Sequence, residues 1–176
     1  MNVQFTIGSD DKGHTLTTLE YIKQGQLIWK YDEKSVRELG VKILTLKEIH
    51  DLPSDERDTF EKYCWQVGTN EWEGVTKNPE NDPMNFVDHS CDPNMHFIDD
   101  DTLVAKRDIK KFERLTLEYA TCDTIYADIP VCLCGAKNCR GTVKATDAYD
   151  TNIIKGCYQR RGVSRTRDPP STPFIS

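Results

Sequence analysis

The sequence contains no apolar run long enough to cross a membrane and no recognisable export signal. A membrane helix needs about 20 consecutive apolar residues, whereas this 176-residue chain is 37% hydrophobic and 30% charged. Its opening, MNVQFTIGSD, has no basic flank followed by an apolar stretch, so no secretory signal is predicted. We therefore expect one intracellular globular domain without a membrane partner.

The body of the chain also lacks the positive charge that binding to a polyanion requires. Residues 155–176 hold five of the 23 Lys/Arg residues and one of the 29 Asp/Glu residues, which leaves 18 basic and 28 acidic residues elsewhere. Phosphate neutralisation drives non-specific nucleic-acid affinity, so we expect no direct nucleic-acid binding. A basic, lysine-containing protein or peptide is a better matched partner. Solubility alone is the alternative explanation of the negative charge.

Cysteines are plentiful, and their spacing favours a metal over disulfides. Disulfides are rare inside cells, and three of the seven cysteines fall within CLCGAKNC at 132–139. Thiolates suit zinc, which takes four ligands in a tetrahedron. The loop supplies three thiolates, and the spacing leaves the fourth open. The candidates for that fourth ligand are Cys91, Cys64, Cys122 and Cys157.

Hydrophobic periodicity predicts a mainly β (α+β) fold with a helical insertion at about 45–84. The stretches with strand-like alternation are 3–7, 14–19, 26–31, 95–98, 102–107 and 115–119. Thr45 and Glu48 form a predicted capping box, and Ser54 is predicted to cap a second helix. That helix is expected to continue through Cys64 to Val67. Residues 155–176 are basic and rich in Pro, Ser and Thr, which predicts a flexible tail.

Four blocks of sequence resemble the SET-domain protein lysine methyltransferases, in the order that this family has them. KGHTLTTLEYIKQGQLIWKY resembles the family's opening K-G-x-G segment and the tyrosine that follows it. NFVDHSCDPN (85–94) resembles N-H-S-C-x-P-N, and LTLEY resembles E-L-T-[FY]-x-Y. CLCGAKNCRG resembles the post-SET motif C-x-C-x4-C-R-G. Together the blocks span roughly residues 8–143.

The resemblance implies a SET fold of small curved sheets, with the segment around 88–91 threaded through a loop as a pseudoknot. It implies a SET domain over 1–125, with the insertion at about 45–84, and a post-SET zinc element over 130–146. In relatives with such an element, the cysteine of the H-S-C motif joins the three post-SET cysteines on one structural zinc. The implied zinc ligands are Cys91, Cys132, Cys134 and Cys139.

The implied activity is methyl transfer from S-adenosylmethionine to the neutral amine of a lysine. Histone tails are the commonest substrates in this family, and a nuclear location follows if the substrate is a histone. By position, Tyr119 matches the active-site tyrosine, Tyr31 matches a second tyrosine of the lysine channel, and Leu117 matches the residue that tunes the number of methyl groups. The implied cofactor-binding residues are Gly13, His14, Thr15, Asp88, His89 and Tyr119.

Four positions depart from the family pattern. Thr15 replaces a glycine where the cofactor approaches closely, and Asp88 replaces an asparagine. The Asp88 carboxylate accepts a hydrogen bond from the cofactor's ammonium group but donates none. Phe112 stands at a turn position expected to be glycine. Leu117 replaces an aromatic residue and has no hydroxyl to hold water in the methyl-product space, which favours higher methylation states.

Two alternative hypotheses remain. In one, the chain is a catalytically weak SET-like module that binds a peptide or partner protein and keeps a structural zinc. Thr15 and Asp88 would then mark a decayed cofactor site. In the other, the chain is a nucleic-acid-binding protein stabilised by zinc. Only the basic tail favours this hypothesis.

Overall fold

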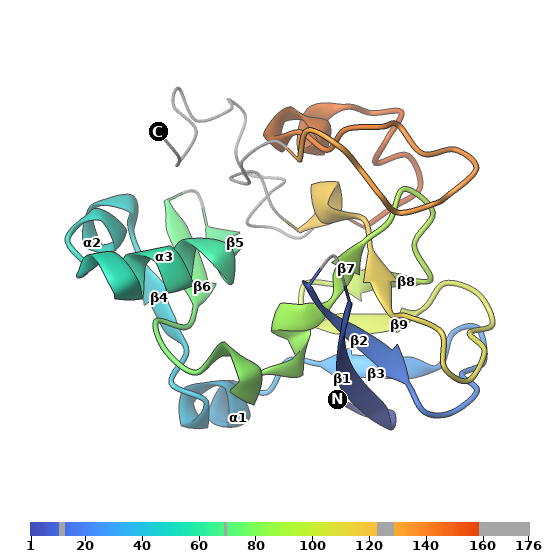
Figure 1. The fold of residues 1–176 in the computed structure, drawn as a ribbon, viewed down its shortest axis with the longest axis horizontal. Helices are drawn as coiled ribbons and strands as arrows, with labels where there is room; N and C mark the ends of the chain where they lie inside the picture. The colour runs from blue at the N-terminus through green and yellow to red at the C-terminus, as the bar shows by residue number, and fades with distance from the viewer. Residues whose placement is uncertain (11–12, 69, 123–128, 159–176) are drawn as a thin grey trace.

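The computed structural model describes residues 1–10, 13–68, 70–122 and 129–158, and four small sheets dominate it (Figure 1). This arrangement confirms the mainly β prediction. Most of the predicted tail, from residue 159 on, lies outside the described residues. No helix in the described ranges is both long and apolar enough to span a bilayer.

Two sheets form the body, and both come from stretches whose alternation predicts strands. β1 (Phe5–Asp10) and β2 (Gly13–Thr18) form an antiparallel pair. A three-stranded antiparallel sheet has the order β3-β9-β8. Its strands are β3 (Leu27–Lys30), β8 (Met95–Asp99) and β9 (Thr102–Ala105). Because apolar side chains from both sheets point inward, fully buried Leu16, Ile28 and Leu103 share one core.

A third sheet and three helices make up a second layer with its own small core. The helices are α1 (Glu33–Glu38), α2 (Leu46–His50) and α3 (Ser54–Lys62). The strands are β4 (Lys42–Leu44), β5 (Trp65–Gly68) and β6 (Glu71–Gly74), in the order β4-β6-β5. Ile49, Phe60, Cys64 and Trp72 form this core between α2, α3 and the sheet, whereas α1 has no buried residue.

The predicted helical insertion is therefore only partly helical. The capping box of Thr45 and Glu48 is confirmed. Ser54 is the first residue of α3 rather than its cap, and no side chain caps that helix. The expected continuation to Val67 is wrong, because α3 ends at Lys62 and the chain turns into β5. The packing against β6 is close: a Cβ on Gly74 would lie 2.9 Å from the Cβ of Cys64.

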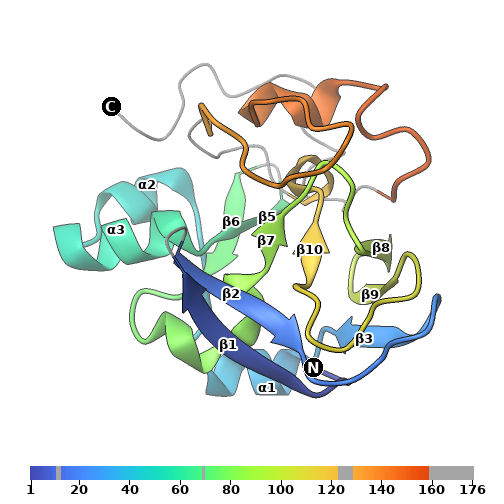
Figure 2. The ribbon, with the colours of Figure 1, turned by 45° about the vertical axis from the view of Figure 1, so that its right-hand side comes forward.

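The fourth sheet consists of two very short parallel strands, β7 (Asp88–His89) and β10 (Thr116–Leu117). The 3-10 helices η1 (Pro79–Asn81) and η2 (Pro83–Phe86) lead into β7, and η3 (Tyr119–Thr121) follows β10. The C-terminal element, residues 129–158, contains the 3-10 helix η4 (Ala145–Tyr149). It lies beside the ends of β7 and β10 (Figures 1 and 2, orange to red).

Phe112 keeps the backbone of the glycine that its position predicts. Its φ is +67°, in the left-handed region, and 67% of its surface is exposed. Its N–H donates to the carbonyl oxygen of Thr18 at 2.8 Å, which fixes the turn. A left-handed backbone conformation costs a residue with a Cβ about 1–2 kcal/mol, so this turn is strained.

We expect Phe112→Gly to raise the free energy of unfolding by about 1 kcal/mol, because it relieves this strain while removing little buried surface. Phe112→Ala is the matched control, since alanine loses the ring but keeps the Cβ. Urea unfolding of both variants and the wild type measures the effect. A gain that is equal in both variants would show that the exposed ring, not the backbone, is unfavourable.

Candidate active site

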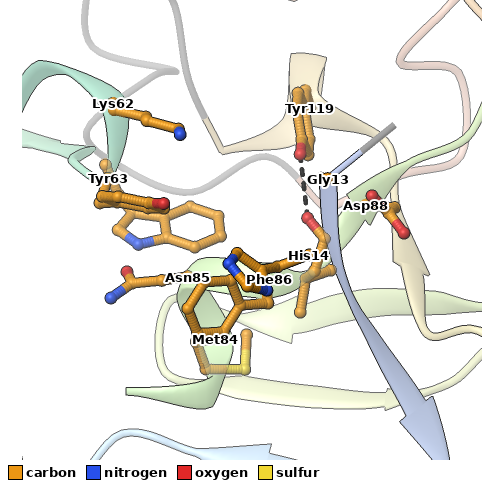
Figure 3. A pocket seen from close by; sticks show the side chains of 11 residues that line it. Gly13, His14, Lys62, Tyr63, Met84, Asn85, Phe86, Asp88 and Tyr119 are labelled. Carbon is orange, nitrogen blue, oxygen red and sulfur yellow. Dashed lines mark hydrogen bonds between the residues drawn. The ribbon is translucent and has the colours of Figure 1, made fainter. Parts of the chain in front are cut away.

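Two cavities meet where β2, β7 and η3 come together. Asp88 and Tyr119 line both of them. The first cavity, of about 220 Å³, is also lined by Gly13 and His14 of β2 (Figure 3). The second, of about 480 Å³, is also lined by His89 and by the C-terminal element. Five of the six predicted cofactor-binding residues therefore line this pair of cavities, and Thr15 does not.

Tyr119 has its hydroxyl fixed by the backbone. It donates to the carbonyl oxygen of Val87 at 2.9 Å (Figure 3, dashed line). Its ring meets the imidazole of His89 edge-on, with the centroids 5.2 Å apart. The predicted active-site tyrosine thus lies at the boundary of the two cavities in a defined orientation.

His89 is a buried neutral ring. Burial lowers its pKa to about 4, although the carboxylate of Glu118 opposes the shift. Its Nδ1 lies 3.5 Å from the backbone nitrogen of Tyr119 and accepts that N–H. The imidazole therefore helps to position Tyr119 and carries no charge at neutral pH.

The other two predicted catalytic residues do not line either cavity. The hydroxyl of Tyr31 lies 3.4 Å from a carboxylate oxygen of Glu73, and its ring packs edge-on against Trp29. Burial and then the charge of Glu73 raise the pKa of Tyr31. Leu117 is completely buried in the main core. The roles of Tyr31 in a lysine channel and of Leu117 in setting the methylation state stay predictions.

The sequence reasoning missed an aromatic wall on the first cavity. Tyr63, Trp65 and Phe86 line it, and the rings of Tyr63 and Phe86 meet edge-on at 6.0 Å (Figure 3). His14 packs against the other edge of Phe86, at 5.2 Å. Phe86 lies inside the NFVDHSCDPN block, which is a signal that could have identified it. Tyr63 was predicted to lie within a helix, so its position between α3 and β5, on the wall of the cavity, was not recognised.

Charged groups of opposite sign face the first cavity. Lys62, the last residue of α3, and Asn85 lie on the side of the aromatic wall, whereas Asp88 lies across β2 from them (Figure 3). The carboxylate of Asp88 accepts a hydrogen bond from the buried hydroxyl of Thr15 at 2.6 Å. Thr15 and Asp88, two of the four positions that depart from the family pattern, are thus in direct contact.

Four cysteines come together at the end of β7. The sulfur atoms of Cys91, Cys132, Cys134 and Cys139 all lie within 4.8 Å of one another. A tetrahedral zinc with bonds of about 2.3 Å places its sulfur ligands about 3.8 Å apart, close to the 4.0 Å between Cys91 and Cys132. Of the candidates for the fourth position, Cys91 is the cysteine that lies with the other three. Cys64 and Cys122 are instead buried in the protein cores.

Arg140 joins the cysteine loop to the active-site strand. Its guanidinium donates two hydrogen bonds of 2.7 Å to the carboxylate of Glu118 and one of 2.8 Å to that of Asp147. It also lies 3.3 Å from the sulfur of Cys91. Glu118 is 5% exposed and caps η3, which begins at Tyr119. The C-terminal element therefore supports the position of Tyr119 through a buried ion-pair network.

Comparison with known proteins agrees with this geometry. The family model described as "SET domain" matches residues 13–120, more than half of the chain. The chain is 26% identical over 141 residues to "Putative histone-lysine N-methyltransferase 1" of Plasmodium falciparum (isolate 3D7), covering 73% of this chain and 2% of that protein. It is 24% identical over 142 residues to "Histone-lysine N-methyltransferase ASHH2" of Arabidopsis thaliana, covering 77% of this chain and 8% of that protein. The chain thus corresponds to a small part of each relative.

Proposed function

Because the chain belongs to the SET-domain family, we propose that it is an S-adenosylmethionine-dependent protein lysine N-methyltransferase whose substrate is a histone-tail lysine. The observation that carries the proposal is the meeting of Asp88 and Tyr119 at the junction of two cavities, the first of which Gly13 also lines. Both relatives are named histone-lysine N-methyltransferases. The excess of acidic residues outside the tail favours a basic substrate. A nuclear location follows from a histone substrate.

The groups around the cavities fit the chemistry of S-adenosylmethionine. Its ammonium group needs an acceptor, which Asp88 supplies where the two cavities meet. Its adenine needs an apolar slot beside the sulfonium end. In the second cavity that slot would be formed by Ile129, Val131 and Leu133.

When bound, S-adenosylmethionine supplies an electrophilic methyl group on a sulfonium. The chain's own residues must present a neutral amine and exclude water. An aromatic wall of Tyr63, Trp65 and Phe86 removes water from an incoming lysine and disfavours its ammonium form, which lowers the pKa of that lysine. The Tyr119 hydroxyl donates its proton to Val87, and a hydroxyl oxygen can also accept, so this group could receive a hydrogen bond from the amine.

The four cysteines would hold one structural zinc ion. Four thiolates leave no open coordination position, so the metal has no part in the chemistry. Its contribution would be local folding energy that ties 132–139 to Cys91 and thereby keeps Arg140 against Glu118. This would complete the wall of the second cavity, which includes Cys132 and Cys134.

We expect Tyr119→Phe to lower the rate of methyl transfer by roughly 100-fold, the usual effect of removing one oriented polar group from an active site. Stability should fall by only about 1 kcal/mol, because one hydrogen bond is lost. The assay is transfer of a labelled methyl group to core histones. Tyr21→Phe is the control, since it removes an exposed hydroxyl that is bonded to Asp108. Wild-type turnover in Tyr119→Phe would refute the catalytic assignment.

We expect the purified protein to contain one zinc ion per chain and Cys134→Ser to lose it. Without zinc, the segment 129–149 should become sensitive to protease while the sheets of the body stay resistant. Elemental analysis and limited proteolysis measure the two effects. Cys157→Ser, which changes a cysteine outside the cluster, should alter neither. Full zinc content in Cys134→Ser would contradict the assignment of the ligands.

A further inference from the structure

Two of the four residues that depart from the family pattern form one hydrogen-bonded pair. Thr15 lies in β2 and Asp88 lies in β7, 73 residues later, yet the Thr15 hydroxyl donates to Oδ2 of Asp88 at 2.6 Å. We propose that Thr15 is a positioning residue that orients the Asp88 carboxylate to accept the α-ammonium group of S-adenosylmethionine. This inference rests on the proposed function.

The side chain of Thr15 does not block the cavities. It is 6% exposed and lines neither cavity. Its methyl carbon faces Gly8, the residue paired with it in β1, where an added Cβ would lie 3.8 Å away. The strand pair therefore accommodates the extra side chain on the side of Gly8. This placement opposes the hypothesis that Thr15 marks a decayed cofactor site.

Both partners of the Asp88 carboxylate approach the same oxygen. Nη1 of Arg114 lies 3.8 Å from Oδ2, the atom that also accepts the Thr15 hydroxyl, and Arg114 pairs with Asp10 of β1 as well. Within the described ranges Oδ1 has no hydrogen-bond partner. The Asp88 side chain is 34% exposed and lines both cavities. Among the described residues Oδ2 is therefore the oxygen that the protein holds, and Oδ1 is the oxygen that can accept from a ligand.

The chemistry of the pair explains why the two departures occur together. An ionised carboxylate only accepts hydrogen bonds, so the Thr15 hydroxyl can serve it as a fixed donor. With asparagine at position 88, the Thr15 hydroxyl would donate to the amide oxygen. The amide NH₂ would then face the ammonium group of the ligand, and both of these groups are hydrogen-bond donors. A carboxylate held by Thr15 instead offers a charge-assisted hydrogen bond to an ammonium group. The pair should therefore determine preference for ligands that carry that group.

A double-mutant cycle with two ligands tests this inference. Calorimetry would compare S-adenosylhomocysteine with its desamino analogue on the wild type, Thr15→Val, Asp88→Asn and the double variant. Neither ligand donates a methyl group, so binding is read without turnover. We expect the wild type to prefer the ammonium-bearing ligand by roughly ten- to a hundredfold, the range for a charge-assisted hydrogen bond.

Asp88→Asn should abolish this preference and Thr15→Val should reduce it several-fold. The double variant should behave like Asp88→Asn alone, because the two residues act as one unit. The desamino analogue should bind all four proteins alike, which reports that the cavities stay folded. Thr6→Val, in the neighbouring strand β1, is the control for losing a threonine hydroxyl and should leave the preference unchanged.

The outcomes separate this inference from the proposed function. A wild type that binds neither ligand overturns the proposed function and the inference with it. A wild type that binds both ligands equally, or a preference that Thr15→Val leaves intact, overturns the inference alone. Additive effects of the two substitutions would likewise show that Thr15 does not act through Asp88.

Discussion

The pairing of β7 with β10 is the constraint on which the rest of the site depends. The two strands are only two residues long, and Ser90 extends the ladder by donating its N–H to the carbonyl oxygen of Leu117 at 2.8 Å. Because the strands are parallel, their carboxyl ends lie at the same edge. Cys91 therefore leaves this edge beside Tyr119, which brings one of the four clustered cysteines and the Tyr119 hydroxyl to one place. Asn94, which is 1% exposed, also stabilises the strand pair. Its side-chain amide donates to the carbonyl oxygen of Arg114 and accepts the backbone N–H of Thr116.

Such short strands need support from both sides, and two polar networks give it. On one side, Arg140 links the cysteine loop to Glu118, the residue that precedes Tyr119. On the other, Thr15 and Arg114 link β2 to Asp88. Each network contains a carboxylate whose partners come from a distant part of the chain. Removing Arg140 would leave the carboxylate of Glu118, a residue only 5% exposed, without its ionic partner, which is why this contact matters more than an exposed ion pair.

Much of the fold and part of the site could be predicted from the sequence. Alternation identified β1, β2, β3, β8 and β9 because each has enough residues to show a period of two. The cysteine spacing and the family blocks together identified the four clustered thiols. The pattern around Phe60 and Cys64 was misread, since the same apolar residues serve a short helix and the edge of a sheet. β6 is as long as β3 and β9, but Trp72 is its only large apolar residue and its partners lie in other segments, so no local period reveals it.

Contacts between distant segments were the other limit. Tyr31 follows β3 and bonds to Glu73 of β6, a neighbour that only the third sheet brings near. Thr15 and Asp88 were considered as two separate departures from the family pattern, but their hydrogen bond makes them one feature. Position in a motif predicts which strand a residue belongs to. It does not predict what that residue meets across the fold.

Hydrogen exchange of the zinc-loaded protein with and without S-adenosylmethionine would show whether the junction beside β7 and β10 binds this compound. Binding there should slow exchange in 13–15, 85–91, 116–119 and 129–134 and leave it unchanged in β4 and β6, which lie outside both cavities. Exchange that is the same in all these segments at saturating S-adenosylmethionine would contradict binding at this junction.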